Sequence, residues 1–129
     1  MKEELYYFAN GCYTTQSRIK RGNRRLEAAF YDAEAMSALA GQKVGFPYAK
    51  EKLTKAWQDV LFTHFHDILT GSCVQDSREH AMGLFQTSMA TANTQITNAM
   101  RVIAEKIDTS SIPVDIDAYN SQSEGAGVG

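Results

Sequence analysis

Apolar residues recur along most of the chain at the three- and four-residue steps of an α-helix. The first run spans 17–39, contains no proline, and places its apolar side chains on one stripe: Ile19, Leu26, Ala29, Phe30, Ala33, Met36 and Leu39. The segment GQKVGFPY at 41–48 follows, and its glycines and proline are typical of a break between helices. This pattern predicts a first helix over about 17–40.

Two further amphipathic runs follow. The run at 49–65 places Leu53, Ala56, Trp57, Val60 and Leu61 on one stripe. It stops near LTGS, where Gly71 can adopt positive φ and Ser72 can act as a cap. The run at 74–108 is the longest, and its stripe comprises Ala81, Leu84, Phe85, Met89, Ala92, Ile96, Ala99, Ile103 and Ile107. The sequence thus predicts a second helix at about 49–65 and a third at about 74–108.

Three amphipathic helices joined by short links predict an all-α fold, an antiparallel three-helix bundle over 17–109. We expect 1–16 to lead into the bundle as an extended segment. At 110–129 the pattern changes to alternating apolar residues and then to Gly and Ser, which predicts an irregular or strand-like tail, or the start of a following β domain.

Charge and composition narrow the classes of partner. The 129 residues carry a formal charge of −2, so no chain-wide field attracts a polyanion, and we expect no nucleic-acid partner. The basic run RIKRGNRR at 18–25 fits the solvated start of a helix, with a phosphate-binding patch as the alternative. No apolar stretch approaches the length of a membrane span, and no membrane partner is expected.

Candidate chemistry is concentrated in LFTHFHDILTGS at 61–72. If His64 and His66 were both helical, their directions would differ by roughly 200°, so they could not share one metal ion. A single histidine at a helix end is typically a surface group that the helix C-terminus favours. Asp67 beside His66 adds a carboxylate, but a catalytic zinc site usually takes three protein ligands.

A local zinc site of His66, Cys73 and His80 is an alternative, although its spacing matches no common zinc framework. The sequence contains no GxSxG elbow and no phosphate-binding loop. Taken alone, these residues do not make a complete active site.

Two segments, GCYTTQSRIKRGNRRLE at 11–27 and FPYAKEKLTKAWQDVLFTHFHDILTGS at 46–72, resemble the helical middle domain of glycoside hydrolase family 38 α-mannosidases. The resemblance covers about 12–108, and HDILTGS is its most specific part. Many relatives read HDILPGS, and we expect Thr70 at the proline position to loosen the turn without altering the ligand. Relatives often carry an amide at the position of His64, which favours His64 as a neighbour of the metal and not a ligand.

The resemblance implies a zinc-dependent, retaining enzyme that hydrolyses terminal α-mannosyl residues. In this family a His-x-Asp pair and another aspartate of the preceding catalytic α/β domain hold the divalent ion, and the histidine of FHD in the middle domain adds one ligand. That histidine is His66 here, and the adjacent Asp67 corresponds to the residue that bonds hydroxyls of the bound mannose. The nucleophile and the acid/base belong to the catalytic domain, so we expect no catalytic residue in this chain.

The expected partners are therefore an α-mannoside or mannose-containing glycan and the catalytic and β domains of the same polypeptide. We expect the isolated chain to be inactive. The competing hypothesis is a non-catalytic helical interaction module, in which the HFHD turn has no role in metal binding.

Overall fold

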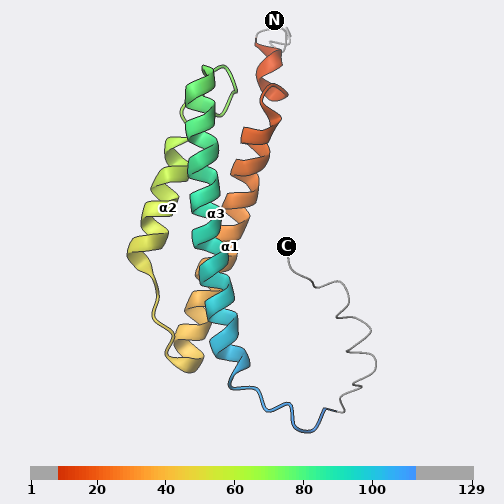
Figure 1. Ribbon diagram of the computed structural model, residues 1–129, viewed down its shortest axis with the longest axis vertical. Coiled ribbons are helices and arrows are strands. Elements are labelled where there is room, and N and C mark those ends of the chain that lie inside the picture. The colour runs from red at the N-terminus through yellow and green to blue at the C-terminus, as the bar shows by residue number, and fades with distance from the viewer. Residues whose placement is uncertain (1–8, 113–129) are drawn as a thin grey trace, which may run out of the picture.

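The computed structural model describes residues 9–112, in which three long helices follow a short 3₁₀ helix (Figure 1). The 3₁₀ helix η1 spans Asn10–Tyr13, α1 spans Ser17–Val44, α2 spans Lys50–Phe62 and α3 spans Gln75–Ala104. The described residues contain no strand. The predicted all-α bundle is confirmed, with α1 longer and both α2 and α3 shorter than expected.

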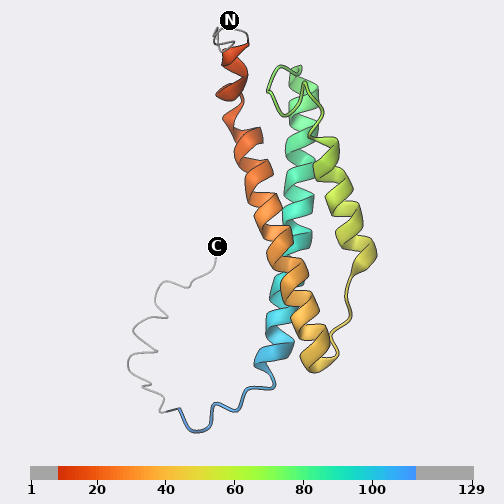
Figure 2. The same cartoon turned by 180° about the vertical axis from the view of Figure 1, so that it is seen from behind.

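The helices form an up-down-up bundle. α1 and α3 run in the same direction, and α2 runs antiparallel to both (Figure 1 and Figure 2). α1 and α3 share the most extensive interface. At a rise of about 1.5 Å per residue, the 28 residues of α1 extend over about 42 Å, whereas the 13 residues of α2 extend over about 20 Å. Non-helical links must therefore cover the remaining length beside α1 and α3.

The apolar stripes of the three helices meet in one core, with Ile68 of the α2–α3 link added to it. Phe30 is fully buried near the middle of α1, and its ring centroid lies 4.7 Å from that of Trp57 on α2. Alanines at other core positions allow close approach of the helices around these larger side chains. The buried apolar cluster comprises Ile19, Leu26, Phe30, Ala33, Leu53, Ala56, Val60, Ile68, Ala81, Phe85 and Ala92.

Polar residues occupy several positions of the same stripes. Asn23 and Ser37 on α1 and Ser88 and Gln95 on α3 are buried. The Ser88 hydroxyl donates to the carbonyl of Ala56 on α2 at 3.4 Å, whereas the Ser37 hydroxyl has no partner among the described residues. Buried polar groups usually require a hydrogen bond, so the Ser88 contact constrains how α2 and α3 pack.

Trp57 is half-buried and anchors α2 to α1 by a polar contact as well as by packing. Its indole Nε1–H donates to Glu34 Oε1 at 2.8 Å. The charge of Glu34 also acts on Tyr48 in the α1–α2 link: partial desolvation of the half-exposed phenol, and then the Glu34 charge, raise the pKa of Tyr48.

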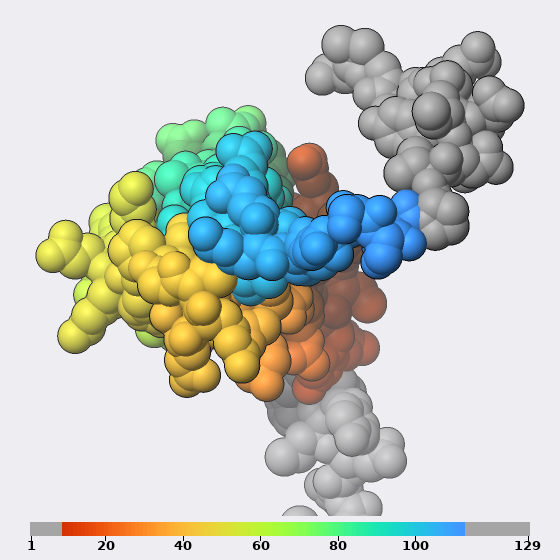
Figure 3. Space-filling view, turned by 90° about the horizontal axis from the view of Figure 1, so that it is seen from below, coloured from red at the N-terminus to blue at the C-terminus, as the bar shows by residue number. Residues whose placement is uncertain are grey.

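The segment before α1 was predicted to be extended, and the structure differs from this where it describes the segment. In the leading segment, 10–13 form the 3₁₀ helix η1. Figure 3 views the bundle from the end where α1 turns into α2 and α3 terminates, and residues 105–112 project away from the helices there. The predicted strand-like part of the tail lies outside the described residues.

Helix α3 was predicted to reach 108 but ends at Ala104 because the chain continues in tighter turns. The amide of Ile107 bonds the carbonyl of Ala104, three residues back, and the Ile107 side chain is exposed. None of the described helices combines the length and apolar character needed to cross a bilayer.

Replacing Phe30 with alanine tests the core. Phe30 is 0% exposed, and its neighbour Tyr31, on the solvent-facing side of α1, is 75% exposed. We expect Phe30→Ala to lower the free energy of unfolding by about 3–5 kcal/mol, because it removes buried contacts and leaves a cavity. The matched variant Tyr31→Ala should change it by about 0.5 kcal/mol or less. Denaturant unfolding followed by circular dichroism measures both, and equal effects would contradict the described core.

Candidate functional site

The candidate residues lie in the link between α2 and α3, at the end of the bundle where α1 begins (Figure 1). The second helix was predicted to continue to 65, but it ends at Phe62 and passes into consecutive turns. The amides of Thr63, His64 and Phe65 each bond the carbonyl three residues back, at 2.9, 3.0 and 3.2 Å. Such bonds tighten the backbone relative to an α-helix. We call residues 63–72 the site turn.

Three residues attach the site turn to the core. Thr63 is fully buried and its hydroxyl donates to the carbonyl of Val60 at 2.6 Å. Ile68 belongs to the apolar cluster, and Gly71 is buried against the residues that precede α1. The exposed residues of the turn therefore lie between fixed, buried positions.

Gly71 is required by both its backbone and its surroundings. Its φ is +83°, a region that side chains other than glycine rarely adopt. A Cβ atom at this position would lie 2.8 Å from the carbonyl oxygen of Thr15 and 2.8 Å from Cβ of Gln16. This close approach joins the end of the site turn to the start of α1.

His64 faces α1. Its Nε2 lies 2.6 Å from Oδ1 of the buried Asn23, and 3.8 Å from Oε1 of Glu27. Asn23 Nδ2 also donates to Glu27 Oε1 at 3.0 Å. His64 is thus occupied by a hydrogen-bond network within the bundle.

His66 and Asp67 face solvent. Their side chains are 78% and 54% exposed, and His66 Nε2 lies 3.5 Å from Asp67 Oδ2. The Phe65 ring packs against the imidazole of His66 with centroids 4.2 Å apart. The imidazole and the carboxylate therefore form an exposed pair on a turn whose flanks are buried.

Hydroxyl groups within the turn bond the same pair. The Thr70 hydroxyl donates to the carbonyl of His66 and lies 3.0 Å from the Ser72 hydroxyl, which in turn donates to Asp67 Oδ1 at 3.3 Å. A proline in place of Thr70 would offer no hydroxyl. Thr70 therefore adds bonds to the turn that the expectation of a looser turn did not include.

The metal-ligating residues of this chain do not form a closed site. Within 9–112, no three or more His, Cys, Asp or Glu side chains come together in a group that could hold a metal ion. The alternative site of His66, Cys73 and His80 is therefore not assembled, and the exposed His80 packs edge-on against Phe62, with ring centroids 6.1 Å apart. An exposed imidazole is a suitable ligand for zinc, so His66 could supply one ligand, but the described residues do not form a complete zinc site.

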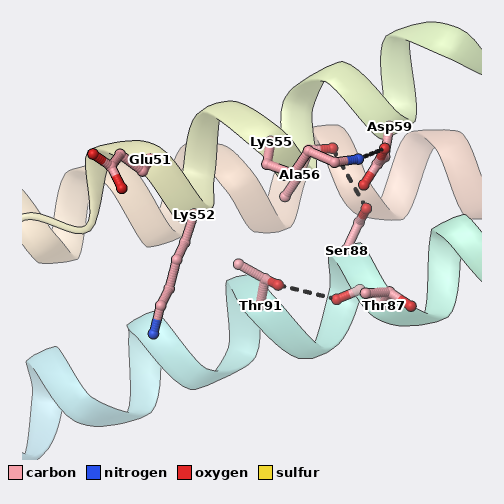
Figure 4. Close-up of a pocket in the computed structure, with 8 residues that line it drawn as sticks. All are labelled: Glu51, Lys52, Lys55, Ala56, Asp59, Thr87, Ser88 and Thr91. Atoms are coloured by element: carbon pink, nitrogen blue, oxygen red, sulfur yellow. Dashed lines mark hydrogen bonds and ion pairs between the residues drawn. The ribbon is translucent and has the colours of Figure 1, made fainter.

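A hollow between α2 and α3 offers no alternative catalytic centre (Figure 4). It has a volume of about 310 Å³, and its polar groups are bonded locally: Lys55 pairs with Asp59, and the Thr91 hydroxyl donates to the carbonyl of Thr87. Such polar side chains, with one local ion pair, are typical of helix surfaces that face solvent.

Comparison with known proteins identifies the domain. The family model described as alpha mannosidase middle domain matches residues 7–103, about three quarters of the chain. The chain belongs to this family. The match confirms the resemblance to the helical middle domain of glycoside hydrolase family 38 that the HDILTGS segment carries.

Several curated α-mannosidases are similar to this middle domain. Alpha-mannosidase 2C1 of Homo sapiens is 38% identical over 91 residues, which are 70% of this chain and 9% of the human protein. Alpha-mannosidase G of Dictyostelium discoideum is 35% identical over 102 residues, 78% of this chain and 9% of that protein. Alpha-mannosidase of Saccharomyces cerevisiae is 33% identical over 75 residues, 56% of this chain and 7% of that protein. The chain thus spans less than a tenth of these relatives, and no solved structure matches it.

Asn23 and Lys20 belong to the surroundings of the site, and sequence analysis did not identify either. Lys20 Nζ donates to the carbonyls of Thr15 and Thr70, at 2.6 and 3.1 Å, from within the basic run on α1. The sequence did offer one indication of these surroundings: Asn23 is a polar residue at a position of the apolar stripe, between Ile19 and Leu26.

Replacing Gly71 with alanine tests how the site turn is attached. Positive φ costs a residue with a side chain about 1–3 kcal/mol, and the Cβ contacts of 2.8 Å add to this cost. We expect a larger loss of unfolding free energy for Gly71→Ala than for Gly45→Ala, because Gly45 has φ +74° but nothing within 4 Å of its Cβ position. Denaturant unfolding compares the two variants. Equal losses would show that the contact with Thr15 and Gln16 is not close.

Proposed function

We propose that this middle domain belongs to a zinc-dependent, retaining α-mannosidase that hydrolyses terminal α-mannosyl residues. In this proposal His66 supplies one ligand to the metal ion, and Asp67 contacts the sugar. The rest of the active site lies in other domains of the same polypeptide. The family membership of the chain is the starting point, and the finer assignments rest on the site turn.

The observation that carries the proposal is the outward pairing of His66 and Asp67. Both side chains are exposed at one end of the bundle, 3.5 Å apart, whereas His64 is directed at α1. A ligand that another domain must complete has to be presented on the surface, and His66 meets this requirement. His64 is less exposed, with 33% of its side chain accessible, and its Nε2 is directed at Asn23 on α1 and not outward.

The donor set is consistent with a shared metal site. Neutral imidazole is a common zinc ligand, and one imidazole with a nearby carboxylate leaves other positions for groups of a second domain. A zinc ion held in part by His66 would supply Lewis-acid contacts to hydroxyls of the sugar, which would favour the oxocarbenium-like transition state of mannoside hydrolysis.

Asp67 is suited to recognition of hydroxyl groups. Its Oδ1 accepts from Ser72, which orients the carboxylate, and its exposed oxygens can accept hydrogen bonds from a sugar. We therefore assign Asp67 a positioning role on mannose and not a proton transfer. Retaining hydrolysis requires two further carboxyl groups, a nucleophile and an acid/base, and we assign these to the catalytic domain.

Substitutions in the full-length polypeptide separate the two roles. Substitution of a residue that only orients a metal ligand typically lowers metal affinity by ~10–100-fold. We expect His66→Ala, which removes a ligand, to lower zinc affinity by more than this. Asp67→Asn should retain zinc but lower kcat/KM on an aryl α-mannoside by about 10- to 100-fold, because a hydrogen bond to a charged group is weakened. Metal analysis and steady-state kinetics measure these effects, and His80→Ala, an exposed histidine at the same end, serves as the control.

Unchanged zinc content and activity in His66→Ala would contradict the proposed function. That result would favour the competing hypothesis of a non-catalytic helical interaction module.

The isolated 129-residue chain should neither hydrolyse aryl α-mannosides nor bind zinc tightly. One imidazole and one neighbouring carboxylate cannot close a coordination shell, so binding should be weak. Titration calorimetry with zinc measures this directly. Tight binding of one zinc ion per chain would show that a local site exists and would contradict a site shared between domains.

A further inference from the structure

The hydrogen-bond network at His64 determines which ring nitrogen carries the proton. The Glu27 carboxylate can only accept, so the Asn23 group at 3.0 Å from it must be the amide Nδ2, which donates. Asn23 Oδ1 then faces His64 and accepts, and His64 Nε2 at 2.6 Å must carry the proton. The opposite orientation of the amide would place its oxygen against a carboxylate. The relay therefore runs in one direction, from His64 through Asn23 to Glu27.

This relay reaches into the bundle. Asn23 is buried on the core-facing stripe of α1, so its side chain has few alternative partners. Glu27, one turn further along α1, is partly exposed and also lies 3.6 Å from the guanidinium of Arg24. A buried amide held by a charged acceptor gives His64 a fixed partner on a long, well-packed helix.

A second contact with α1 follows His66 and Asp67 in the sequence. Lys20, one turn before Asn23 on α1, donates from Nζ to the carbonyl of Thr70 at 3.1 Å. His64 and Thr70 flank His66 and Asp67, and each is bonded to α1. The exposed pair thus lies on a segment attached to the same helix on both sides.

We propose that His64 is a positioning residue, which holds the site turn on α1 through Asn23 and Glu27 and thereby fixes the direction of His66 and Asp67. This inference rests on the proposed function of His66 and Asp67. His64 itself contacts neither metal nor sugar in this proposal. Its role is to remove the freedom of the backbone two residues before the proposed ligand.

The physical basis is the cost of misplacing a ligand. Without the His64 ring, the turn keeps Thr63 in the core and its contact with Lys20, but it loses its hydrogen bond to α1 before His66, and Asn23 Oδ1 loses its partner. Groups that orient metal ligands typically contribute 10–100-fold to metal affinity or activity. The effect requires no contact between His64 and the reacting atoms.

The test uses the full-length polypeptide and a set of matched variants. His64→Ala removes the donor, and His64→Gln restores an amide N–H that can reach Asn23 Oδ1. Glu27→Ala leaves His64 in place but removes the acceptor that orients Asn23, and it alters no buried side chain. His80→Ala is the histidine control, because His80 is exposed on α3 and has no part in the relay.

Three readouts are measured on each variant: amide hydrogen exchange of 63–72, zinc affinity, and kcat and KM on an aryl α-mannoside. We expect His64→Ala to accelerate exchange in the site turn about tenfold and to weaken zinc binding about 10- to 100-fold. Glu27→Ala should show smaller changes in the same direction. His64→Gln should restore most of both properties, and His80→Ala should match the unmodified protein.

The outcomes separate this inference from the function on which it rests. If His66→Ala loses zinc but His64→Ala and Glu27→Ala retain normal exchange and zinc affinity, the positioning role is wrong and the proposed function stands. The same conclusion follows if His64→Ala accelerates exchange without weakening zinc binding. If His66→Ala retains zinc, the proposed function fails first. Should His64→Ala fail to fold, Glu27→Ala decides the question by the same readouts.

Discussion

Burial of one face of α1 against α3 is the constraint on which the rest of this domain depends. The two long helices run side by side in the same direction, and the shorter α2 returns between their ends. Because α2 covers only about 20 Å of this length, the chain must complete the return in a non-helical link before α3 can begin. That link carries the candidate site, and its position beside the start of α1 follows from the packing of the long helices.

Buried and exposed residues alternate along the link. The buried residues hold the backbone on the core, so the exposed side chains between them face solvent. Thr63, Ile68 and Gly71 are buried, and His66 and Asp67 project to solvent between them. In the proposed α-mannosidase this arrangement divides the work between domains. The helical domain supplies a rigid support and two polar groups, and the domains that complete the site supply the remaining ligands and the carboxyl groups of the reaction.

Helical periodicity predicted the three helices and most of the core, because residues such as Ile19, Phe30 and Phe85 recur at the expected steps. It did not predict the buried polar residues Asn23 and Ser88, because a search for apolar stripes passes over a residue whose burial depends on a partner elsewhere in the sequence. Leu61 was assigned to the core but is exposed, because it lies on the outer side of the last turn of α2.

The sequence also located the site without its geometry. His66 and Asp67 were selected from the HDILTGS segment, and both assignments remain predictions. The helical argument separated His64 from His66 by direction, and the two rings do have different surroundings, although the segment consists of turns. What the sequence could not supply was the long-range partner, since Asn23 lies 41 residues from His64.

The most direct measurement is a crystal structure of the full-length polypeptide with data collected at the zinc absorption edge. We expect an anomalous peak about 2.0–2.1 Å from a ring nitrogen of His66, with the remaining zinc ligands supplied by another domain and with His64 still bonded to Asn23. A metal ion bound to His64, or one that contacts no residue of the site turn, would contradict this expectation.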